Sequence, residues 1–215
     1  MANEVKCVIV SGSPENDLDF IKQNIGSEDY IIAADSGYKK LEAFGIKPDV
    51  IVADFDSSEK PVTDIEIMVY PVEKDATDTF NAVKLAVDKG YKDILILGAL
   101  GGRLDHTYSN ILCLEYARKH DADCVIADRN NRLSLITSHK RIVKDYKWFS
   151  VFAFLGECKG IKFDGSHYDQ GFYNKKSLDF KPEDQLGQSN YVENEYCDIS
   201  VESGILLLIE ANDIL

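Results

Sequence analysis

Six short apolar runs, each followed by polar or glycine-rich residues, recur through the first 127 residues of this 215-residue sequence. They occupy positions 6–10, 30–34, 50–53, 65–70, 94–97 and 123–127. A strand without polar residues is buried on both faces, which is typical of a parallel sheet covered by helices. The intervening segments 17–24, 38–44, 77–89 and 105–119 are expected to supply those helices. The alternation therefore predicts a parallel α/β sheet.

Acids and glycines follow these predicted strands with unusual regularity. The strand ends carry residues 11–12, 35–37, 54–56, 74–78, 98–106 and 128–131. Ligands bind beyond the carboxyl ends of the strands in open α/β sheets. The sequence therefore predicts one ligand site along this edge of the sheet.

The pattern changes after residue 132. Residues 133–136, 148–155, 159–163, 197–201 and 204–209 are typical of short strands, and clear long helices are absent from the sequence pattern. Residues 202–204 are typical of a hairpin turn. We therefore expect an α/β domain over residues 1–132 and a small antiparallel β-sandwich over residues 133–215.

The composition excludes several classes of function. A formal net charge of −13 argues against a general binder of nucleic acids or anionic membranes, although it permits one nucleotide bound as its magnesium complex. No apolar run approaches the ~20 residues that span a bilayer, and the N-terminus does not have the pattern of a signal peptide. The five cysteines are odd in number and lack CxxC spacing. Reduced, mostly buried thiols in a cytoplasmic protein are expected.

Asp54 and Asp56 form the first candidate site, directly after the apolar run 50–53. In an extended chain their side chains point the same way, roughly 6–7 Å apart. Two like charges at ~7 Å repel by about 2.4 kcal/mol at an effective dielectric of ~20. A divalent cation such as Mg²⁺ would relieve this repulsion. The alternative is a pair of solvated turn residues, and this pair alone leaves both interpretations open.

The glycine-rich segment 98–103 forms a second candidate, between a predicted strand and a predicted helix. Glycines let the backbone approach an anion, and the N-terminus of a helix offers free N–H groups. The segment is neither GxGxxG nor a Walker loop. Arg103 adds donors that match phosphate oxygens. Asp105 and His106 start the predicted helix, where a helix cap and a surface histidine are the alternatives.

Lys74, Asp75 and Asp78 form a third candidate. Lys74 is either a phosphate contact beside metal ligands or part of a solvated salt bridge. Asp78 is either a metal ligand or an acid that favours the positive end of a helix dipole. Carboxylates, basic side chains and glycine-loop amides together suit phosphoryl transfer, which depends mainly on positioning and charge stabilisation. The residues therefore predict a Mg²⁺-dependent enzyme that acts on a nucleotide phosphate, with the acceptor left open.

At these same residues the chain resembles the thiamine pyrophosphokinase family. The resemblance runs in order through ADSG (34–37), GIKPD (45–49), DFDS (54–57), KDATD (74–78) and GGRLDH (101–106), and extends to LGQSN (186–190) and GILLLI (204–209). Each motif alone is common, but the combination of DFDS, KDxTD and GGRxDH is specific. Ser36 and Ala53 stand where the family usually or often has glycine, and residues 168–196 match poorly.

The resemblance implies a Rossmann-like α/β domain that binds the nucleotide and a β-sandwich domain that binds thiamine and forms a homodimer. Active sites would lie in clefts between subunits. The hydroxyl of thiamine would attack the β-phosphorus of ATP, which releases AMP and thiamine diphosphate. A pyrophosphokinase with another acceptor, such as a pterin alcohol, and a non-catalytic sensor of nucleotide or thiamine are the alternatives.

The resemblance also implies roles for individual residues in these motifs. Asp54, Asp56 and Asp78 would bind Mg²⁺, and with Arg103 and Asp105 they make up the expected catalytic set. Asn110 would contact the nucleotide or thiamine near the transferred group, and Ser189 and Asn190 would hold thiamine. The remaining expected ligand-binding residues are Asp35, Gly37, Lys74, Asp75, Gly101, Gly102 and His106.

Overall fold

The structure is a computed structural model that describes residues 5–14, 17–54, 63–69 and 76–213. The chain divides into two compact units, Met1–Arg129 and Asn130–Leu215. The boundary expected after residue 132 would cut strand β7 (Asn131–Ile136). That strand begins with the polar residues Asn131 and Arg132, so the apolar pattern alone predicts a first residue that is too late in the sequence.

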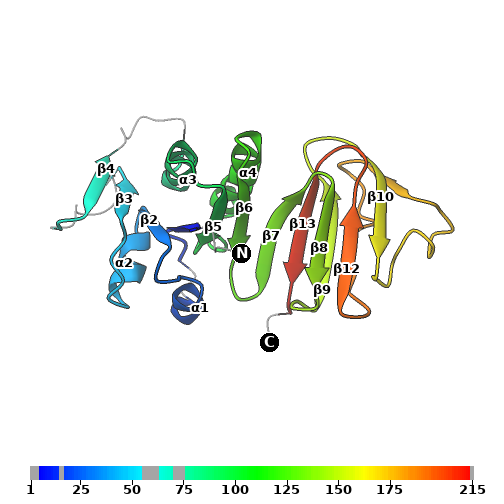
Figure 1. Cartoon of the computed structure of the whole chain (residues 1–215), viewed down its shortest axis with the longest axis horizontal. Helices are drawn as coiled ribbons and strands as arrows, with labels where there is room; N and C mark the ends of the chain where they lie inside the picture. Colours follow the sequence, from blue (N-terminus) through cyan, green and yellow to red (C-terminus); the bar gives the residue numbers. More distant parts are fainter. Residues whose placement is uncertain (1–4, 15–16, 55–62, 70–75, 214–215) are drawn as a thin grey trace. The chain divides into compact units, whose positions relative to one another are not determined.

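The first unit is a parallel sheet with the strand order β4-β3-β2-β1-β5-β6 (Figure 1). Its strands are β1 (Cys7–Val10), β2 (Tyr30–Ala34), β3 (Val50–Ala53), β4 (Glu66–Val69), β5 (Asp93–Leu97) and β6 (Asp123–Ala127). Its helices are α1 (Leu18–Gln23), α2 (Gly37–Glu42), α3 (Asp78–Asp88) and α4 (Leu104–Lys119). All of these elements were expected from the sequence, and the α/β prediction is confirmed.

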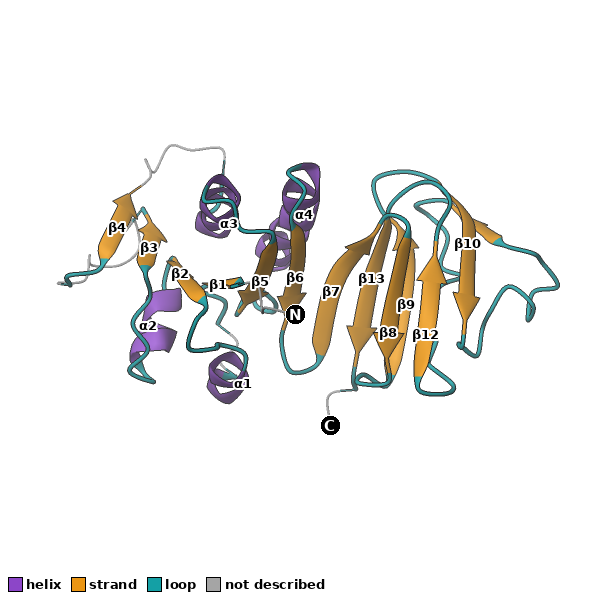
Figure 2. Ribbon diagram, in the orientation of Figure 1, coloured by secondary structure: helices purple, strands orange, loops and turns teal. Residues whose placement is uncertain are grey.

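Helices cover both faces of this sheet. Figure 2 shows α1 and α2 on one face and α3 and α4 on the other. Phe80 of α3 and Tyr116 of α4 meet edge to face, with ring centroids 4.8 Å apart. All four residues of β1 are fully buried, because helices pack on both sides of this strand.

The strand order reverses between β1 and β5. The chain leaves β1 towards β2, β3 and β4 on one side, and then returns through α3 to β5 on the other side. The segments that follow β1 and β5 therefore lead to helices on opposite faces of the sheet, α1 on one face and α4 on the other. This switch point is where ligands bind in doubly wound sheets.

Gly37 lets the turn after β2 pack directly against the end of β1. A Cβ atom at this position would lie 1.9 Å from the carbonyl oxygen of Val10. Only glycine permits so close an approach of two backbone segments. The contact brings the acidic end of β2 next to the switch point.

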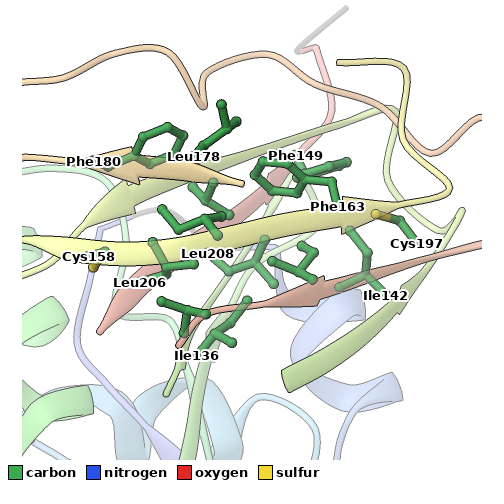
Figure 3. Packing of buried hydrophobic residues seen from close by; sticks show 14 of the residues in the cluster. Ile136, Ile142, Phe149, Cys158, Phe163, Leu178, Phe180, Cys197, Leu206 and Leu208 are labelled. Atoms are coloured by element: carbon green, nitrogen blue, oxygen red, sulfur yellow. The ribbon is translucent and has the colours of Figure 1, made fainter. Parts of the chain in front are cut away.

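The second unit is a β-sandwich. One sheet has the order β7-β13-β9, with β13 (Leu206–Ala211) and β9 (Trp148–Ala153), and every pairing in it is antiparallel. The other has the order β11-β10-β12-β8, with β11 (Leu178–Phe180), β10 (Cys158–Asp164), β12 (Tyr196–Ser200) and β8 (His139–Val143). Both sheets contribute to one core, in which Phe149, Phe163 and Phe180 are the largest buried side chains (Figure 3). The predicted sandwich is confirmed.

The predicted hairpin at residues 202–204 is wrong. β12 pairs with β8 and β10, whereas β13 pairs with β7 and β9, so the intervening residues carry the chain from one sheet to the other. Gly204 has a φ of +97°, and Ser203 pairs with Lys159 of β10. The sequence also did not predict β8, which has Ile142 as its one buried residue, and it gave no bounds for the three-residue β11.

All five cysteines are free and buried, as the sequence predicts. Burial raises the pKa of Cys7, Cys113 and Cys197 to about 12, because an apolar environment disfavours the thiolate. Within the part of the chain that the structure describes, no helix is long and apolar enough to cross a membrane.

We expect Gly37→Ala to destabilise the first unit by about 3 kcal/mol, because the added Cβ overlaps the Val10 carbonyl oxygen, a backbone atom that cannot move aside as a flexible side chain can. This corresponds to a thermal midpoint lower by about 6–12 °C. Gly156→Ala is the matched control, since a Cβ there meets nothing within 4 Å. Thermal denaturation followed by circular dichroism measures both. Equal midpoints for the two variants would contradict the close approach.

Candidate active site

A cavity of about 560 Å³ lies at the carboxyl edge of the first-unit sheet. Its walls come from the segments that follow β1, β2, β3 and β5 and from the start of α3. The lining residues are Ser11, Gly12, Ser13, Pro14, Asp35, Asp54, Ala76, Thr77, Asp78, Thr79, Ala99, Gly101, Arg103, His106 and Asn110.

Segment 11–14 forms the centre of this site. The Ser11 N–H donates to the Leu97 carbonyl at 2.8 Å, and the Ser13 N–H donates to the Gly98 carbonyl at 2.9 Å. These bonds continue the β1–β5 ladder beyond the ends of both strands. The Ser13 hydroxyl also donates to the carbonyl of Leu100. The segment is therefore fixed to the glycine-rich loop along its length.

Ser11 also connects the segment to α3. Its Oγ lies 2.6 Å from Oγ1 of Thr79, and this contact is buried. Thr77 caps the same helix by accepting the Phe80 N–H at 3.2 Å. The first turn of α3, which carries Asp78, is thereby held against the end of β1.

Gly12 connects the segment to the end of β2. A Cβ atom at Gly12 would lie 2.4 Å from Oγ of Ser36 and 2.8 Å from Oδ2 of Asp35. Asp35 has a φ of +52°, which aspartate tolerates better than most residues, and its N–H donates to the Val52 carbonyl at 2.9 Å. The absence of a side chain at Gly12 makes room for the Asp35 carboxylate in the cavity wall.

The glycine-rich loop after β5 depends on left-handed backbone angles. Gly98, Gly101 and Gly102 have φ values of +61°, +83° and +64°. Asn110, which is buried on α4, donates from Nδ2 to the Ala99 carbonyl at 2.7 Å and so ties the loop to this helix. The loop leads directly into α4, whose first N–H groups have no partner within the helix.

Arg103 and Asp105 pair with each other at the rim of the cavity. Nε and Nη2 of Arg103 donate to the two oxygens of Asp105 at 3.1 and 2.6 Å. Asp105 also accepts the N–H of His106 at 3.0 Å. The hydrogen bonds from Arg103 lower the pKa of Asp105 to about 2. Both side chains are exposed, so the pair is accessible to a ligand.

Three carboxylates reach the cavity from different parts of the sequence. Asp35 follows β2, Asp54 follows β3 and Asp78 starts α3. Asp56, Lys74 and Asp75 lie outside the described residues. Among the residues that the structure describes, no group of three or more histidine, cysteine, aspartate or glutamate side chains is close enough to enclose a metal.

Mg²⁺ does not need such a group. It binds one or two carboxylates and completes its coordination with water and substrate phosphates. Asp54 and Asp78 supply two carboxylates to one cavity, and all the charged acceptors that line it are hard oxygen donors. The residues present therefore fit this ion.

The first unit thus brings most of the predicted site together. The predicted residues that line the cavity are Asp35, Asp54, Asp78, Gly101, Arg103, His106 and Asn110. Gly37 starts α2, Gly102 belongs to the glycine-rich loop and Asp105 lies in the first turn of α4; these three do not line the cavity. Sequence reasoning named residues 11–12 as a strand end but gave Ser11, Ser13 and Thr79 no role in the site. A hydroxyl-rich turn after the first strand was the available signal.

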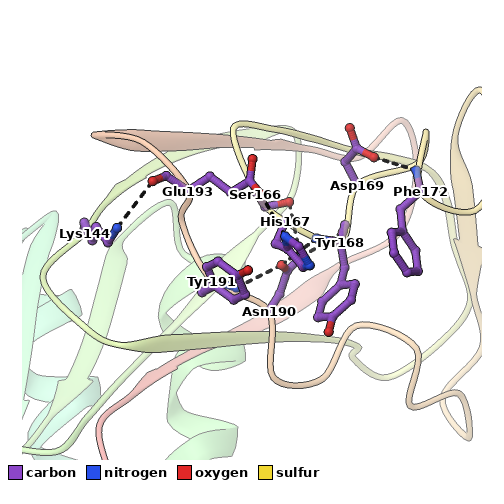
Figure 4. A network of polar contacts seen from close by, with 9 residues as sticks. All are labelled: Lys144, Ser166, His167, Tyr168, Asp169, Phe172, Asn190, Tyr191 and Glu193. Carbon is purple, nitrogen blue, oxygen red and sulfur yellow. Dashed lines mark hydrogen bonds and ion pairs between the residues drawn. The ribbon is translucent and has the colours of Figure 1, made fainter.

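Ser189 and Asn190 lie in the second unit. Asn190 is buried, and its Nδ2 donates to Oγ of Ser166 at 3.2 Å and to the Tyr168 carbonyl at 2.9 Å (Figure 4). Its Oδ1 accepts the N–H groups of Tyr168 and Tyr191 at 3.0 and 2.9 Å. These four bonds use the full hydrogen-bonding capacity of the amide. The Asn190 amide is therefore saturated by its bonds to Ser166, Tyr168 and Tyr191.

Those residues form an aromatic group. His167 stacks on Tyr191 with ring centroids 4.7 Å apart, and Tyr168 meets Phe172 edge to face at 5.1 Å. Oε1 of Glu193 accepts a hydrogen bond from Nδ1 of His167 at 2.8 Å. We call His167, Tyr168, Phe172 and Tyr191 the aromatic group below.

Comparison with known proteins gives the same family from sequence and from fold. A family model described as the thiamin pyrophosphokinase catalytic domain matches residues 21–126. Thiamine pyrophosphokinase of Bacillus subtilis (strain 168) is 32% identical over 218 residues, which cover 95% of this chain and 98% of that relative.

Two solved structures agree. Thiamin pyrophosphokinase from Geobacillus thermodenitrificans has a TM-score of 0.83 and 26% identity, covering 97% of this chain and 98% of its own. Yeast thiamin pyrophosphokinase, at 14% identity, has the same fold with a TM-score of 0.73 over 98% of this chain and 87% of its own. This chain therefore belongs to the thiamine pyrophosphokinase family, which is a family of enzymes.

Proposed function

We propose that this chain transfers the pyrophosphoryl group of ATP to the hydroxyl of thiamine, giving thiamine diphosphate and AMP. The observation that carries the proposal is the cavity at the switch point of the sheet. There Asp35, Asp54 and Asp78 line the same cavity as the glycine-rich loop and Arg103. Carboxylates opposite phosphate-binding groups suit a nucleotide bound with a cation.

The glycine-rich loop and Arg103 would hold the phosphates of ATP. The loop opens a 16-residue helix, and the first N–H groups of such a helix favour anions. Arg103 offers a planar set of donors that matches phosphate oxygens. Asp105 fixes the orientation of that guanidinium through its two hydrogen bonds. The role of Asp105 is then to position Arg103.

Asp54, Asp56 and Asp78 would bind Mg²⁺. When bound there, the ion neutralises charge on the phosphate oxygens. Lys74 and Asp75 are proposed, from the sequence motif alone, as ligand-binding residues beside the metal site, with Lys74 as a phosphate contact.

The reaction exchanges one phosphorus–oxygen bond for another. A bond forms between the thiamine hydroxyl oxygen and the β-phosphorus, and the bond from that phosphorus to the oxygen bridging to the α-phosphate breaks. The electron pair of the broken bond leaves with AMP. The hydroxyl proton must go to a base. Arg103 lowers the pKa of Asp105 to about 2, which makes Asp105 a poor acceptor. Asp78 and water are the remaining candidates, and because a carboxylate that binds Mg²⁺ is a weaker base, water is favoured.

The second unit would supply the thiamine contacts. Ser189 and Asn190 are the proposed residues, and the saturated hydrogen bonding of Asn190 supports an indirect role for it. Tyr168 and Phe172 of the aromatic group offer ring faces on which the cationic thiazolium or the pyrimidine can stack. The proposed cytoplasmic location is supported by the five free, buried cysteines.

The purified chain is expected to release AMP from ATP and Mg²⁺ only when thiamine is present, with one thiamine diphosphate formed per AMP. Chromatographic quantification of both products tests this. If AMP is released with a pterin alcohol and not with thiamine, the acceptor is a pterin alcohol. Tight binding of ATP or thiamine without AMP release over hours would favour the non-catalytic sensor.

Asp54→Asn and Asp78→Asn are each expected to lower kcat/KM by at least about 100-fold, because they remove a charge from the cation site. Both should raise the Mg²⁺ concentration needed for half-maximal rate. The matched control is Asp64→Asn, which breaks only an exposed ion pair with Lys47 and should leave the rate unchanged. If Asp78 acts only on the helix dipole, Asp78→Asn will lower stability slightly and leave the rate near that of the wild type.

We propose a homodimer in which α4 of the first unit contributes to the interface, in addition to the second-unit sandwich that the family resemblance implies. Leu104, Tyr108 and Leu112 recur every fourth residue along α4 and are 80%, 58% and 37% exposed. Residues with this spacing share one face of a helix, and exposed apolar stripes mark interaction surfaces. The stripe begins directly beside Arg103, which supports a partner subunit at the site.

Sedimentation at micromolar concentration is expected to give a dimer for the wild type and a monomer for Tyr108→Glu/Leu112→Glu, because two buried carboxylates would disrupt an apolar interface. Val5→Glu is the control, since Val5 is exposed at the amino end of β1, away from the carboxyl edge. A wild type that sediments only as a monomer would contradict the dimer. A dimer that survives the double substitution would contradict the role of α4.

A further inference from the structure

Lys40 is a buried lysine that the proposed chemistry does not use. It lies on α2 and is only 7% exposed, while its neighbour Lys39 is exposed. Lysine is almost never fully buried unless its ammonium has a specific partner. Burial lowers the pKa of Lys40 to about 8, so the side chain is still mainly protonated at neutral pH.

The ammonium of Lys40 lies where two loops of the site meet. Nζ donates to the carbonyl oxygen of Ser13 at 2.6 Å. A Cβ atom at Gly98 would lie 2.8 Å from the same Nζ and 2.8 Å from the carbonyl oxygen of Ser11. Gly98 therefore leaves the space into which the ammonium fits. The two loops are those that follow β1 and β5 at the switch point.

Lys40 approaches the site from behind. It lines a second cavity of about 270 Å³ and does not line the 560 Å³ cavity. Gly12, Ser13 and Pro14 border both cavities, so they form the wall between them. A charged N–H donor on one side of that wall restrains the carbonyl of Ser13, and through it the face that a ligand meets on the other side.

We propose that Lys40 is a positioning residue for the nucleotide site, which holds segment 11–14 in the conformation that receives the phosphates. The inference rests on the proposed function for the identity of the nucleotide. It requires no contact between Lys40 and the substrate. The proposal gives α2 a role in the site, although Lys40 belongs to none of the sequence motifs that predict the site.

The test compares Lys40→Met with the wild type and with Lys39→Met. Methionine keeps the length of the side chain and removes the donor. It no longer buries a charge, which offsets in part the cost of leaving the Ser13 carbonyl without its charged donor. We expect kcat/KM for ATP to fall at least tenfold in Lys40→Met, with the thermal midpoint within about 2 °C of the wild type. Lys39→Met should stay within twofold of the wild type in both measurements.

Two outcomes would overturn the inference. One is a kcat/KM for Lys40→Met within twofold of the wild type. The other is a loss of activity together with a thermal midpoint lowered by more than about 5 °C, which indicates a general packing role. If Lys40→Met does not fold, Lys40→Gln takes its place under the same criteria.

A binding measurement separates this inference from the proposed function. Calorimetric titration with Mg²⁺ and α,β-methylene ATP reports the nucleotide site without turnover. If the wild type releases no AMP with thiamine, the proposed reaction is wrong. The inference about Lys40 still stands in that case, provided that Lys40→Met binds this analogue at least tenfold more weakly than the wild type. Equal binding by the two proteins overturns the inference, whatever the reaction.

Discussion

The hydrogen bonds of segment 11–14 are the constraint on which the candidate site depends. Its backbone continues the ladder between β1 and β5, and the hydroxyls of Ser11 and Ser13 reach α3 and the glycine-rich loop. Gly12 lets the acidic end of β2 close against it. One short turn therefore holds three parts of the cavity wall: the end of β2, the start of α3 and the loop after β5. Small side chains are required there, because larger ones would occupy the space between the loops.

Charge is distributed across this site in two zones. The carboxylates Asp35, Asp54 and Asp78 enter from the segments after β2 and β3 and from α3, whereas Arg103 enters from the loop after β5. The chain as a whole carries a net charge of −13, so an anionic nucleotide meets general repulsion outside the cavity. A bound cation and a localised guanidinium are the means by which such a protein can hold a phosphate. This arrangement favours a nucleotide that arrives as its metal complex.

The sequence predicted most of the first unit because buried parallel strands have an unmistakable apolar pattern, and acids directly after them must meet at one edge. It did not predict the role of Lys40, since a lysine on a short helix is ordinarily solvated. It missed β8, which begins with the polar residues His139, Lys140 and Arg141. The turn at 202–204 was assigned to a hairpin because local turn chemistry is the same whether the next strand joins the same sheet or the opposite one. Which sheet a strand joins is decided by core packing, which a local pattern does not contain.

The switch-point topology has a consequence for how this protein acquires its site. The cavity takes residues from positions 11, 35, 54, 78 and 103, which are separated by most of the length of the first unit. No short fragment contains enough of them to bind a ligand, so binding requires the parallel sheet to be complete from β3 to β5. Parallel pairings between distant segments form slowly, since chain entropy must be lost before contacts are gained. A bound nucleotide would then stabilise the whole sheet rather than one loop, and would couple substrate supply to the lifetime of the folded enzyme.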